Sequence, residues 1–479
     1  MLTLALFSHS RYLCGAERML LNLALLLERS RTVRPVLLVP GEGELICQAR
    51  HHGLAHQIIP APPWYLLRPG DMNDYRRGVI GCSEALKQIL VDLNSDAVLV
   101  NTMTNVPAML AAVTLDIPSL LWVHGVIDSL LLPRRESEFA TPHDELLLHS
   151  ATRVIALSNY TSHFCARVLR RERLDVIHNW TPVDRQFAAP PGKYRSRQFA
   201  CLNTFDPHKG HAALLKAAAL LKAKQISFQL NLYGDGEVRG AMESQATALG
   251  VRDCVRFLGR TADVQDVYDR SLGIINPAQV EPFGMTLIEA MARKTPVVST
   301  RSGGPADIVV DGQSGYLVDR GDAAALADRM QALLESPESA QRMGEQGFQR
   351  VCAHFNEEVA RAAFLPVIEG AVSDFQGYDP AVKTLTKMYR LWLDQVANGP
   401  AHSTPASLSA AGAMQNAARL AKGSIRRTKA LGKRVLAALG MRTAGLLSRA
   451  FARYDSQHTP PSSYQQLRDG SANALRGVP

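Results

Sequence analysis

Short, almost wholly apolar runs recur along most of this chain, and amphipathic segments with helical periodicity separate them. Strands that are buried on both faces of a sheet have this pattern, because every side chain packs against a covering layer. Strands that alternate with helices predict parallel sheets covered by helices on both faces. The expected strands lie at residues 1–7, 36–39, 97–100, 120–123, 154–157, 199–202, 230–233, 255–258, 274–275 and 296–298, with helices such as 212–224 and 322–334 between them.

A break in this alternation divides the chain into two parts. Residues 181–197 contain three prolines and Gly192 among polar residues, which predicts a hinge between two doubly wound domains. The expected first domain is 1–185 and the second is 195–371, and a helical segment at 372–396 could cross back to the first domain. Ligands bind in such sheets at the carboxyl ends of the strands, so two facing domains predict a binding cleft between them.

The basic charge of the protein is confined to its C-terminal end. The chain of 479 residues has a net charge of +9, but residues 396–479 hold twelve Lys or Arg against two Asp. The remaining residues are nearly neutral, with 41 basic and 42 acidic side chains. The overall charge therefore gives no argument for nucleic-acid binding by the two domains, and nucleic acid is not an expected partner.

Residues 397–479 are expected to form a basic, partly helical and partly disordered tail. No acidic residue occurs between Arg419 and Arg453, and apolar residues recur there at roughly helical spacing, although four glycines weaken such a helix. Three interpretations stay open: an amphipathic segment on an anionic membrane surface, a flexible solvated tail, or a binding segment for RNA or a protein partner.

Cysteine usage and hydropathy predict a cytoplasmic protein. The seven cysteines are widely spaced without a Cys-x-x-Cys pair, which argues against a disulfide framework or a zinc ribbon. No basic residue precedes the apolar start of the chain, so we expect a buried strand there and not a signal peptide. No uncharged apolar stretch reaches the roughly 18 residues of a membrane span. Association with the inner face of a membrane would therefore depend on the tail.

The segment from Glu281 to Ala292 carries the strongest chemical signal. A strand is expected to end at residue 276, and a helix is expected to start near Gly284 or Met285. Glycine allows a ligand to approach the backbone closely, and the free amides of a helix start favour a phosphate. Glu281 could accept hydrogen bonds from sugar hydroxyls, and Glu289, about one turn inside the helix, could hold the two hydroxyls of a ribose.

This segment resembles the signature of the family-4 retaining glycosyltransferases. The resemblance lies in two glutamates with seven residues between them, in Phe283 and Gly284 after the first, and in Glu-Ala-Met-Ala at the second. It continues through residues 296–300, 302–305 and 311–318, which are similar to the next strand and glycine turns of that family. The resemblance implies the GT-B fold, in which two Rossmann-like domains face a cleft, and it covers about residues 1–372.

The resemblance also implies roles for individual residues. Glu281 and His124 would act on the donor sugar as the catalytic residues, and Glu289 would hold the ribose. Lys209, followed by a glycine, is similar to the lysine of the family's Arg-x-x-x-x-Lys-Gly, whose two cations grip the donor diphosphate. The other expected donor-binding residues are Gly15, Gly234, Phe283, Gly284, Met285 and Thr286.

Two positions depart from the family pattern. Thr204 stands where the family has the diphosphate-binding arginine, so Arg260, Lys193 or another residue would have to replace that cation. Cys14 takes the place of the first glycine in the family's Gly-Gly-x-Glu loop, of which Gly15 is the second.

The implied function is transfer of a sugar, with retention of its anomeric configuration, from a nucleotide-diphosphate sugar to a glycan or lipid-linked acceptor in cell-surface polysaccharide synthesis. No cofactor or metal is expected, because a lysine, backbone amides and a helix dipole would meet the donor charge. The departure at Thr204 leaves open a binding protein for nucleotide sugars without catalytic activity. An epimerase or a phosphorylase on the same fold is a third possibility.

Overall fold

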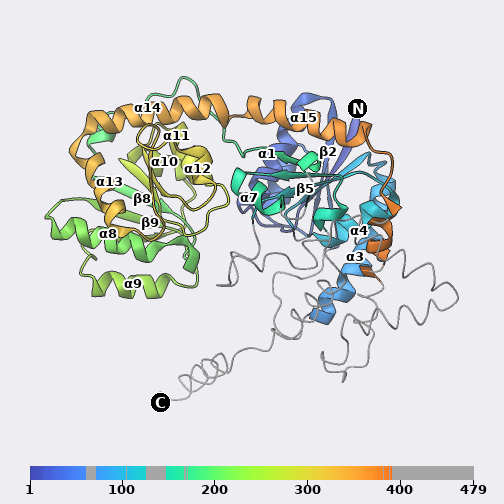
Figure 1. Ribbon diagram of the computed structural model, residues 1–479, viewed down its shortest axis with the longest axis horizontal. Coiled ribbons are helices and arrows are strands. Elements are labelled where there is room, and N and C mark those ends of the chain that lie inside the picture. Colours follow the sequence, from blue (N-terminus) through green and yellow to red (C-terminus); the bar gives the residue numbers. More distant parts are fainter. Residues whose placement is uncertain are drawn as a thin grey trace, which may run out of the picture.

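The computed structural model describes residues 1–60, 72–103, 105–125, 147–166, 169, 171–380, 382–387 and 389–390. These residues form two α/β domains that lie side by side (Figure 1). Each domain contains one fully parallel sheet, as the alternation of apolar runs and helices predicts. The expectations for the tail at residues 397–479 lie outside the described residues.

The first sheet has seven strands in the order β3-β2-β1-β4-β5-β6-β7. Every pair of neighbours in it is parallel. Leu2 to Phe7 of the first strand pair with Val33 to Leu38 of the second. The strands are β1 (Leu2–Phe7), β2 (Val33–Val39), β3 (His56–Ile58), β4 (Ala97–Asn101), β5 (Ser119–Val123), β6 (Arg153–Ala156) and β7 (Leu174–Val176).

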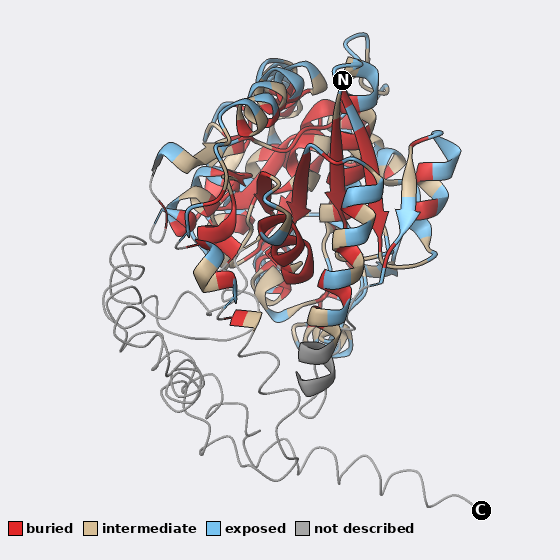
Figure 2. Ribbon diagram, turned by 90° about the vertical axis from the view of Figure 1, so that its right-hand side faces the viewer, coloured by how far each residue is buried: buried red, intermediate tan, exposed pale blue. Residues whose placement is uncertain are grey.

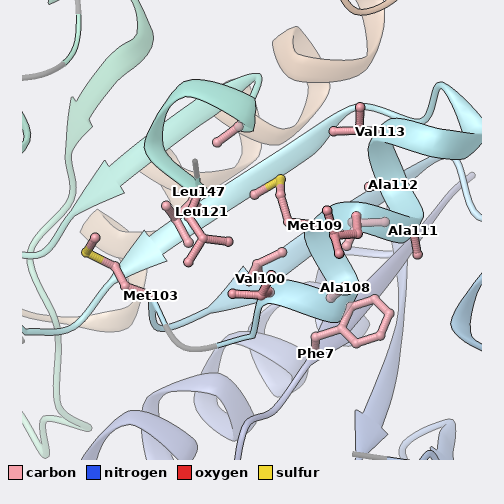
Figure 3. Packing of buried hydrophobic residues seen from close by; sticks show 14 of the residues in the cluster. Phe7, Val100, Met103, Ala108, Met109, Ala111, Ala112, Val113, Leu121 and Leu147 are labelled. Carbon is pink, nitrogen blue, oxygen red and sulfur yellow. The ribbon is translucent and has the colours of Figure 1, made fainter. Parts of the chain in front are cut away.

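Helices cover both faces of this sheet, since alternate strand residues point to opposite sides. On one face, Leu4, Leu6 and Trp122 pack with α1 (Gly15–Ser30) and α2 (Glu44–His51). On the other face, Ala5, Phe7 and further strand residues pack with the helices α3 (Met72–Asp92), α4 (Val106–Leu115) and α7 (Asn159–Cys165). Figure 3 shows Met109 and Ala108 of α4 packed beside Phe7, Val100 and Leu121 of the strands.

The second sheet has six strands in the order β10-β9-β8-β11-β12-β13. They are β8 (Gln198–Leu202), β9 (Gln229–Tyr233), β10 (Val255–Gly259), β11 (Gly273–Asn276), β12 (Val297–Thr300) and β13 (Tyr316–Val318). The covering helices are α8 (His211–Ala223), α9 (Arg239–Ala248), α10 (Val264–Arg270), α11 (Met285–Ala292), α12 (Pro305–Ile308), α13 (Ala323–Glu335) and α14 (Pro337–His354). In Figure 2, which has the first domain in front, the buried residues fill the strands, and exposed residues lie on the outer helices.

The chain returns to the first domain earlier than the expected boundary at residue 371. Helix α15 (Glu357–Ser373) runs from α14 across the top of the first domain (Figure 1). Its Phe364 packs against Trp122 and Trp180, with ring centroids 5.0 and 5.7 Å apart. Sequence periodicity places α15 in the second domain because an amphipathic helix looks the same whichever sheet it covers.

The described part of the segment after α15 stays on the first domain. The Tyr378 hydroxyl donates to the carbonyl of Ile117 at 2.9 Å and lies 2.7 Å from Ser119 Oγ. Lys383 pairs with Asp116 at 2.8 Å, at the C-terminal end of α4. The chain thus crosses between the domains twice, once at residues 177–197 and once at α15.

Candidate functional site

The site lies where the order of the strands reverses in each sheet. In the first sheet β1 lies between β2 and β4, and in the second β8 lies between β9 and β11. Successive connections leave such a switch point in opposite directions, which opens a crevice at the carboxyl ends of the strands. The loops after β8 and β11 carry Lys209 and Glu281, and the loop after β1 carries Gly15. The fold therefore brings together residues that lie far apart in the sequence.

Lys209 and Glu281 form an ion pair at the switch point of the second sheet. The Lys209 Nζ atom lies 3.0 Å from Glu281 Oε2, and their side chains are only 17% and 13% exposed. Asn276, the last residue of β11, donates from Nδ2 to the same carboxylate oxygen at 3.5 Å. The main chain of Glu281 is fixed as well, because its N–H donates to Ser302 and its carbonyl accepts from Gly304. The carboxylate thus has a defined position beside a cation.

Helix α11 starts next to this pair, at Met285. Gly284 is its N-cap residue with a φ of 115°, and no side chain caps the first turn. A Cβ at Gly284 would lie 3.0 Å from Leu287 Cδ1, so both the conformation and the space favour glycine. The uncapped amides at the start of α11 are available to an anion, and the helix dipole favours one. Thr286, in the first turn, is partly exposed at this position.

Glu289 has partners from both domains. Its Oε2 atom accepts from the Tyr268 hydroxyl at 2.7 Å, and its Oε1 atom lies 3.6 Å from Arg18 Nη1. Tyr268 belongs to α10 of the second domain, and Arg18 lies in the first turn of α1 in the first domain. Burial raises the pKa of Glu289, although the Tyr268 hydrogen bond and the Arg18 charge act in the opposite direction. The carboxylate is therefore held in place at a cost in solvation.

His124 directly follows β5 and lies against its last aromatic residue. The imidazole ring is 4.3 Å from the Trp122 ring, and its Nε2 atom has no hydrogen-bond partner among the described residues. Burial lowers the pKa of His124 to about 3, and the nearby His9 acts in the same direction. The imidazole is therefore neutral near pH 7, and its Nε2 atom is buried with unused hydrogen-bonding capacity among the described residues.

The remaining expected donor-binding residues fall into two groups. The Phe283 side chain is 3% exposed and packs in the core of the second domain, so only its main chain is available to a ligand. Gly234 has a φ of 130°, and a Cβ there would lie 2.0 Å from the Asn203 carbonyl oxygen. This close approach accounts for the glycine without a ligand. By contrast, Gly15 is exposed, has open space around it, and opens helix α1. Met285 packs against the cores of both domains.

The structure separates the candidates for the cation missing at position 204. Thr204 is exposed and its hydroxyl donates to Asp206. Lys193 is 3% exposed, and its Nζ atom donates to the Arg293 carbonyl at 2.6 Å and to Thr295 Oγ1 at 2.8 Å. Those acceptors lie at the C-terminal end of α11, opposite to the end expected to meet the donor. Lys193 is therefore not the replacement.

Arg260 and Arg18 are the cations that reach the edge of the first domain near Cys14. Cys14 occupies the N-cap position of α1, but its side chain makes no hydrogen bond there. Burial and the Glu17 charge raise the pKa of Cys14, and the charges of Arg260 and Arg18 oppose that rise. Arg260 is exposed and follows β10, at the outer edge of the second sheet.

Polar contacts close the two domains against each other beside the site. The Ser158 hydroxyl donates to the Pro282 carbonyl at 2.6 Å. The carboxylate of Asp307 accepts from the Asn159 N–H at 2.6 Å and lies 3.3 Å from His178 Nε2. The loop that carries Glu281 is thus attached to the first domain. Sequence reasoning did not assign a role to Arg18, Tyr268 or Asn276, because each acts on a carboxylate from another element.

The described residues contain neither a cluster of metal ligands nor a membrane-spanning helix. In this part of the chain, no group of three or more His, Cys, Asp or Glu side chains is arranged to hold a metal ion. None of the described helices combines the length and the apolar character that a membrane crossing requires. Metal-independent chemistry stays a prediction.

Curated proteins with similar sequences are glycosyltransferases. The lipopolysaccharide core biosynthesis glycosyltransferase LpsE of Rhizobium meliloti is 31% identical over 202 residues, which is 41% of this chain and 58% of LpsE. The D-inositol 3-phosphate glycosyltransferase of an Arthrobacter strain is 33% identical over 229 residues, which is 41% of this chain and 51% of that protein. The chain therefore spans little more than half the length of these relatives.

Solved structures with the same fold include proteins in complex with nucleotides or nucleotide sugars. Anabaena HepE in complex with UDP-glucose has a TM-score of 0.64 and 19% identity, and the match covers 77% of this chain and 100% of HepE. Sucrose-phosphate synthase from Thermosynechococcus elongatus has a TM-score of 0.64 and 19% identity, and that match covers 78% of this chain and 100% of the synthase. These likenesses confirm the expected GT-B fold.

Two family models match consecutive parts of the chain and meet at the hinge. Residues 14–185 match the model of Glycosyltransferase Family 4, and residues 184–350 match the model of glycosyl transferases group 1. Together they cover residues 14–350, which include every strand of the two sheets except β1 and every residue of the site described above except His9. The chain belongs to the family-4 glycosyltransferases, with the group 1 domain as its second domain.

Proposed function

We propose that this protein transfers a sugar from a nucleotide-diphosphate sugar to an acceptor hydroxyl, with retention of the anomeric configuration. The observation that carries the proposal is the Lys209–Glu281 pair beside the uncapped start of α11, with Glu289 one turn further along. Glu281 would face the sugar, Lys209 and the start of α11 the diphosphate, and Glu289 the ribose, which is the order of these groups in a nucleotide sugar. The binding of UDP-glucose by HepE, a protein of the same fold, supports this donor class.

In the proposed reaction, the bond between the anomeric carbon and the phosphate oxygen breaks, and the acceptor oxygen forms the new bond. Lys209 and the amides at the start of α11 would stabilise the negative charge on the leaving diphosphate. Glu281 and neutral His124 would position the sugar hydroxyls while positive charge develops on the ring. The acceptor proton can pass to the departing phosphate oxygen, so the proposal requires neither a protein base nor a metal.

The proposed acceptor is a growing cell-surface polysaccharide or a lipid-linked sugar. The name of LpsE, a lipopolysaccharide core enzyme, supports this class of acceptor. The basic segment of residues 419–453 supports it further, because such a segment could hold the enzyme on the anionic inner face of a membrane. The protein would then act from the cytoplasm, where nucleotide sugars are available.

The direct test is a panel of UDP-, GDP- and ADP-sugars incubated with the purified full chain, with release of free nucleoside diphosphate as the measurement. Wild type should release it from one donor, and Glu281→Ala should not. Glu335→Ala, a change at an exposed glutamate on α13, is the matched control and should behave as wild type. The product, analysed by NMR with a saccharide acceptor, should have the anomeric configuration of the donor.

The alternatives give different results in the same experiment. A donor that raises the melting temperature without any turnover, with or without acceptor, would support a binding protein. Conversion of the donor to its epimer without acceptor would identify an epimerase, and turnover only with added inorganic phosphate would identify a phosphorylase. If no donor of the panel were bound or turned over, the proposed function would be excluded.

A further inference from the structure

The site contains two cations and two carboxylates, and each cation is paired with one carboxylate. Lys209 pairs with Glu281 at 3.0 Å, and Arg18 pairs with Glu289 at 3.6 Å. The second pair is looser, and the Arg18 side chain is 47% exposed while that of Glu289 is 16% exposed. Arg18 belongs to the first domain and Glu289 to the second, so this pair joins the two domains across the site.

A nucleotide-diphosphate sugar has groups that can bind all four side chains. In that case the carboxylates and the cations would contact the ligand instead of each other. Carboxylates accept hydrogen bonds from hydroxyls, whereas ammonium and guanidinium groups donate to phosphate oxygens. Arg18 Nη1 lies 3.6 Å from Oε1 of Glu289, so ribose hydroxyls that bind this oxygen compete with the guanidinium. The released guanidinium is then an unpaired cation beside a diphosphate.

We propose that Arg18 leaves Glu289 when the donor binds and instead binds the donor diphosphate, so that the first domain supplies the second phosphate-binding cation of the site. This inference rests on the proposed function. Its consequence is that bound donor, and not the empty protein, fixes the first turn of α1 against the second domain through a phosphate contact.

The order of strands favours Arg18 over Arg260 for this role. Arg260 follows β10, which is separated from β8 by β9, and two strand spacings correspond to about 10 Å. Lys209 follows β8, and Glu289 lies on the helix that follows the neighbouring strand β11. Arg18 already contacts that helix through Glu289 and starts from the uncapped first turn of α1. The Arg260 charge also acts on Cys14 of the first domain, but among the described residues Arg260 forms no ion pair with Glu281 or Glu289.

The exchange of partners predicts that removal of Arg18 has opposite effects on the affinity for a nucleoside and on the affinity gained from the diphosphate. Removal of Arg18 frees Glu289, so a nucleoside should bind as well as before or more tightly. The same change removes a charged hydrogen bond to the diphosphate, so the gain in affinity from monophosphate to diphosphate should shrink. A residue with a purely structural role would lower both affinities by the same factor.

The test measures affinities by calorimetry for nucleoside, monophosphate and diphosphate in the uridine, guanosine and adenosine series. In Arg18→Ala, the ratio of diphosphate to monophosphate affinity should fall about tenfold or more, as expected for a lost charged hydrogen bond. Arg18→Lys should retain part of the ratio. Arg29→Ala is the matched control, because Arg29 lies on the same helix and also pairs across elements, with Glu357 at 2.6 Å. Melting temperatures check that each variant is folded.

Three outcomes would overturn the inference. An equal loss for nucleoside, monophosphate and diphosphate in Arg18→Ala would make Arg18 a structural residue. Loss of the ratio in Arg260→Ala, with Arg18→Ala unchanged, would assign the cation to Arg260. If wild type bound no member of any series, the proposed function would fail first and this inference with it; binding with an unaltered ratio in Arg18→Ala would overturn the inference alone.

Discussion

The Nζ atom of Lys209 lies 3.0 Å from Oε2 of Glu281, and both side chains are more than four-fifths buried. Two charges in such a place have lost much of their hydration, so each depends on the other. The pair joins the loop after β8 to the loop after β11 at the switch point of the second sheet. The same two residues therefore affect both the stability of the fold and the donor chemistry. Mutation can separate these two effects.

Lys209→Met should destabilise the protein, because it leaves the Glu281 carboxylate buried with only the weak 3.5 Å contact from Asn276. Loss of one partner of a buried ion pair costs about 3–5 kcal/mol, and the partial exposure here places the expected loss at the lower end. The double variant Lys209→Met with Glu281→Gln should recover most of this stability but no turnover. Urea unfolding and release of nucleoside diphosphate measure the two effects. Equal stability of the single and double variants would contradict the expected cost of an unpaired buried carboxylate at Glu281.

Glu289→Gln should stabilise the empty protein while it weakens nucleotide binding. Burial raises the pKa of Glu289, so the folded state binds a proton more tightly than the unfolded state. Burial of the ionised carboxylate therefore lowers the stability of the fold only where the group is ionised. This loss is absent below the ordinary pKa of glutamate and is complete above the raised pKa of Glu289. The melting temperature of the variant relative to wild type should increase as pH rises through this window and then stay constant.

The same variant should bind nucleoside about tenfold more weakly, because an amide accepts hydroxyl hydrogen bonds less strongly than a carboxylate. Thermal melts between about pH 4 and pH 8, together with calorimetry at neutral pH, provide the measurements. Glu335→Gln on exposed α13 is the control for the general effect of a lost charge. A pH-independent difference in melting temperature would contradict the assignment of the effect to Glu289.

Apolar patterning predicted the central strands of both sheets because those strands are buried on both faces. The strands that it missed are β3, β7 and β13, and each of them lies at the edge of a sheet. They contain three residues each: β3 and β7 are partly exposed and include polar residues, whereas β13 is an apolar run that is too short to stand out. An edge strand has one neighbour and needs less apolar surface. Length decides the outcome as well, because the edge strand β10 has five residues and was predicted.

The site was predictable to the extent that it lies within single segments. Glu281, Gly284 and Glu289 lie on one loop and helix, and the structure places them as that segment predicts. The Arg18–Glu289 contact joins two domains and depends on how they are placed, which no local pattern contains. The burial of Lys193 is another example, since the sequence could not distinguish a helix-capping lysine from one that binds phosphate.

Lys193→Met should reduce the pH dependence of stability in the alkaline range. Burial lowers the pKa of Lys193 from 10.5 to about 7, so between these values the unfolded state binds more protons than the folded state. Stability contributed by Lys193 therefore rises with pH from about 7 to 10.5 and is lost as pH falls through this range. The difference in melting temperature between wild type and Lys193→Met should grow between pH 7 and pH 10.

The exposed Lys216→Met variant on α8 is the control and should differ from wild type by a constant amount across the same range. Other titrating groups are common to all three proteins, so they cancel in the differences. A constant difference for Lys193→Met as well would mean that Lys193 stays charged in the folded protein. The hydrogen bonds to the Arg293 carbonyl and Thr295 would then be donated by an ammonium group.

Gly15 and Gly234 should respond in opposite ways to an added side chain. Gly234→Ala places a Cβ 2.0 Å from the Asn203 carbonyl oxygen at a φ of 130°, so the main chain must shift and the melting temperature should fall sharply. Gly15→Ala meets no atom within 4 Å and should leave stability unchanged or raise it by up to about 1 kcal/mol. Gly15→Leu should remain folded but increase the donor Kd about tenfold or more, because its side chain would occupy the space beside the first turn of α1. Thermal melts and calorimetry with the nucleoside diphosphate that wild type binds measure both effects, and unaltered binding by Gly15→Leu would remove Gly15 from the donor site.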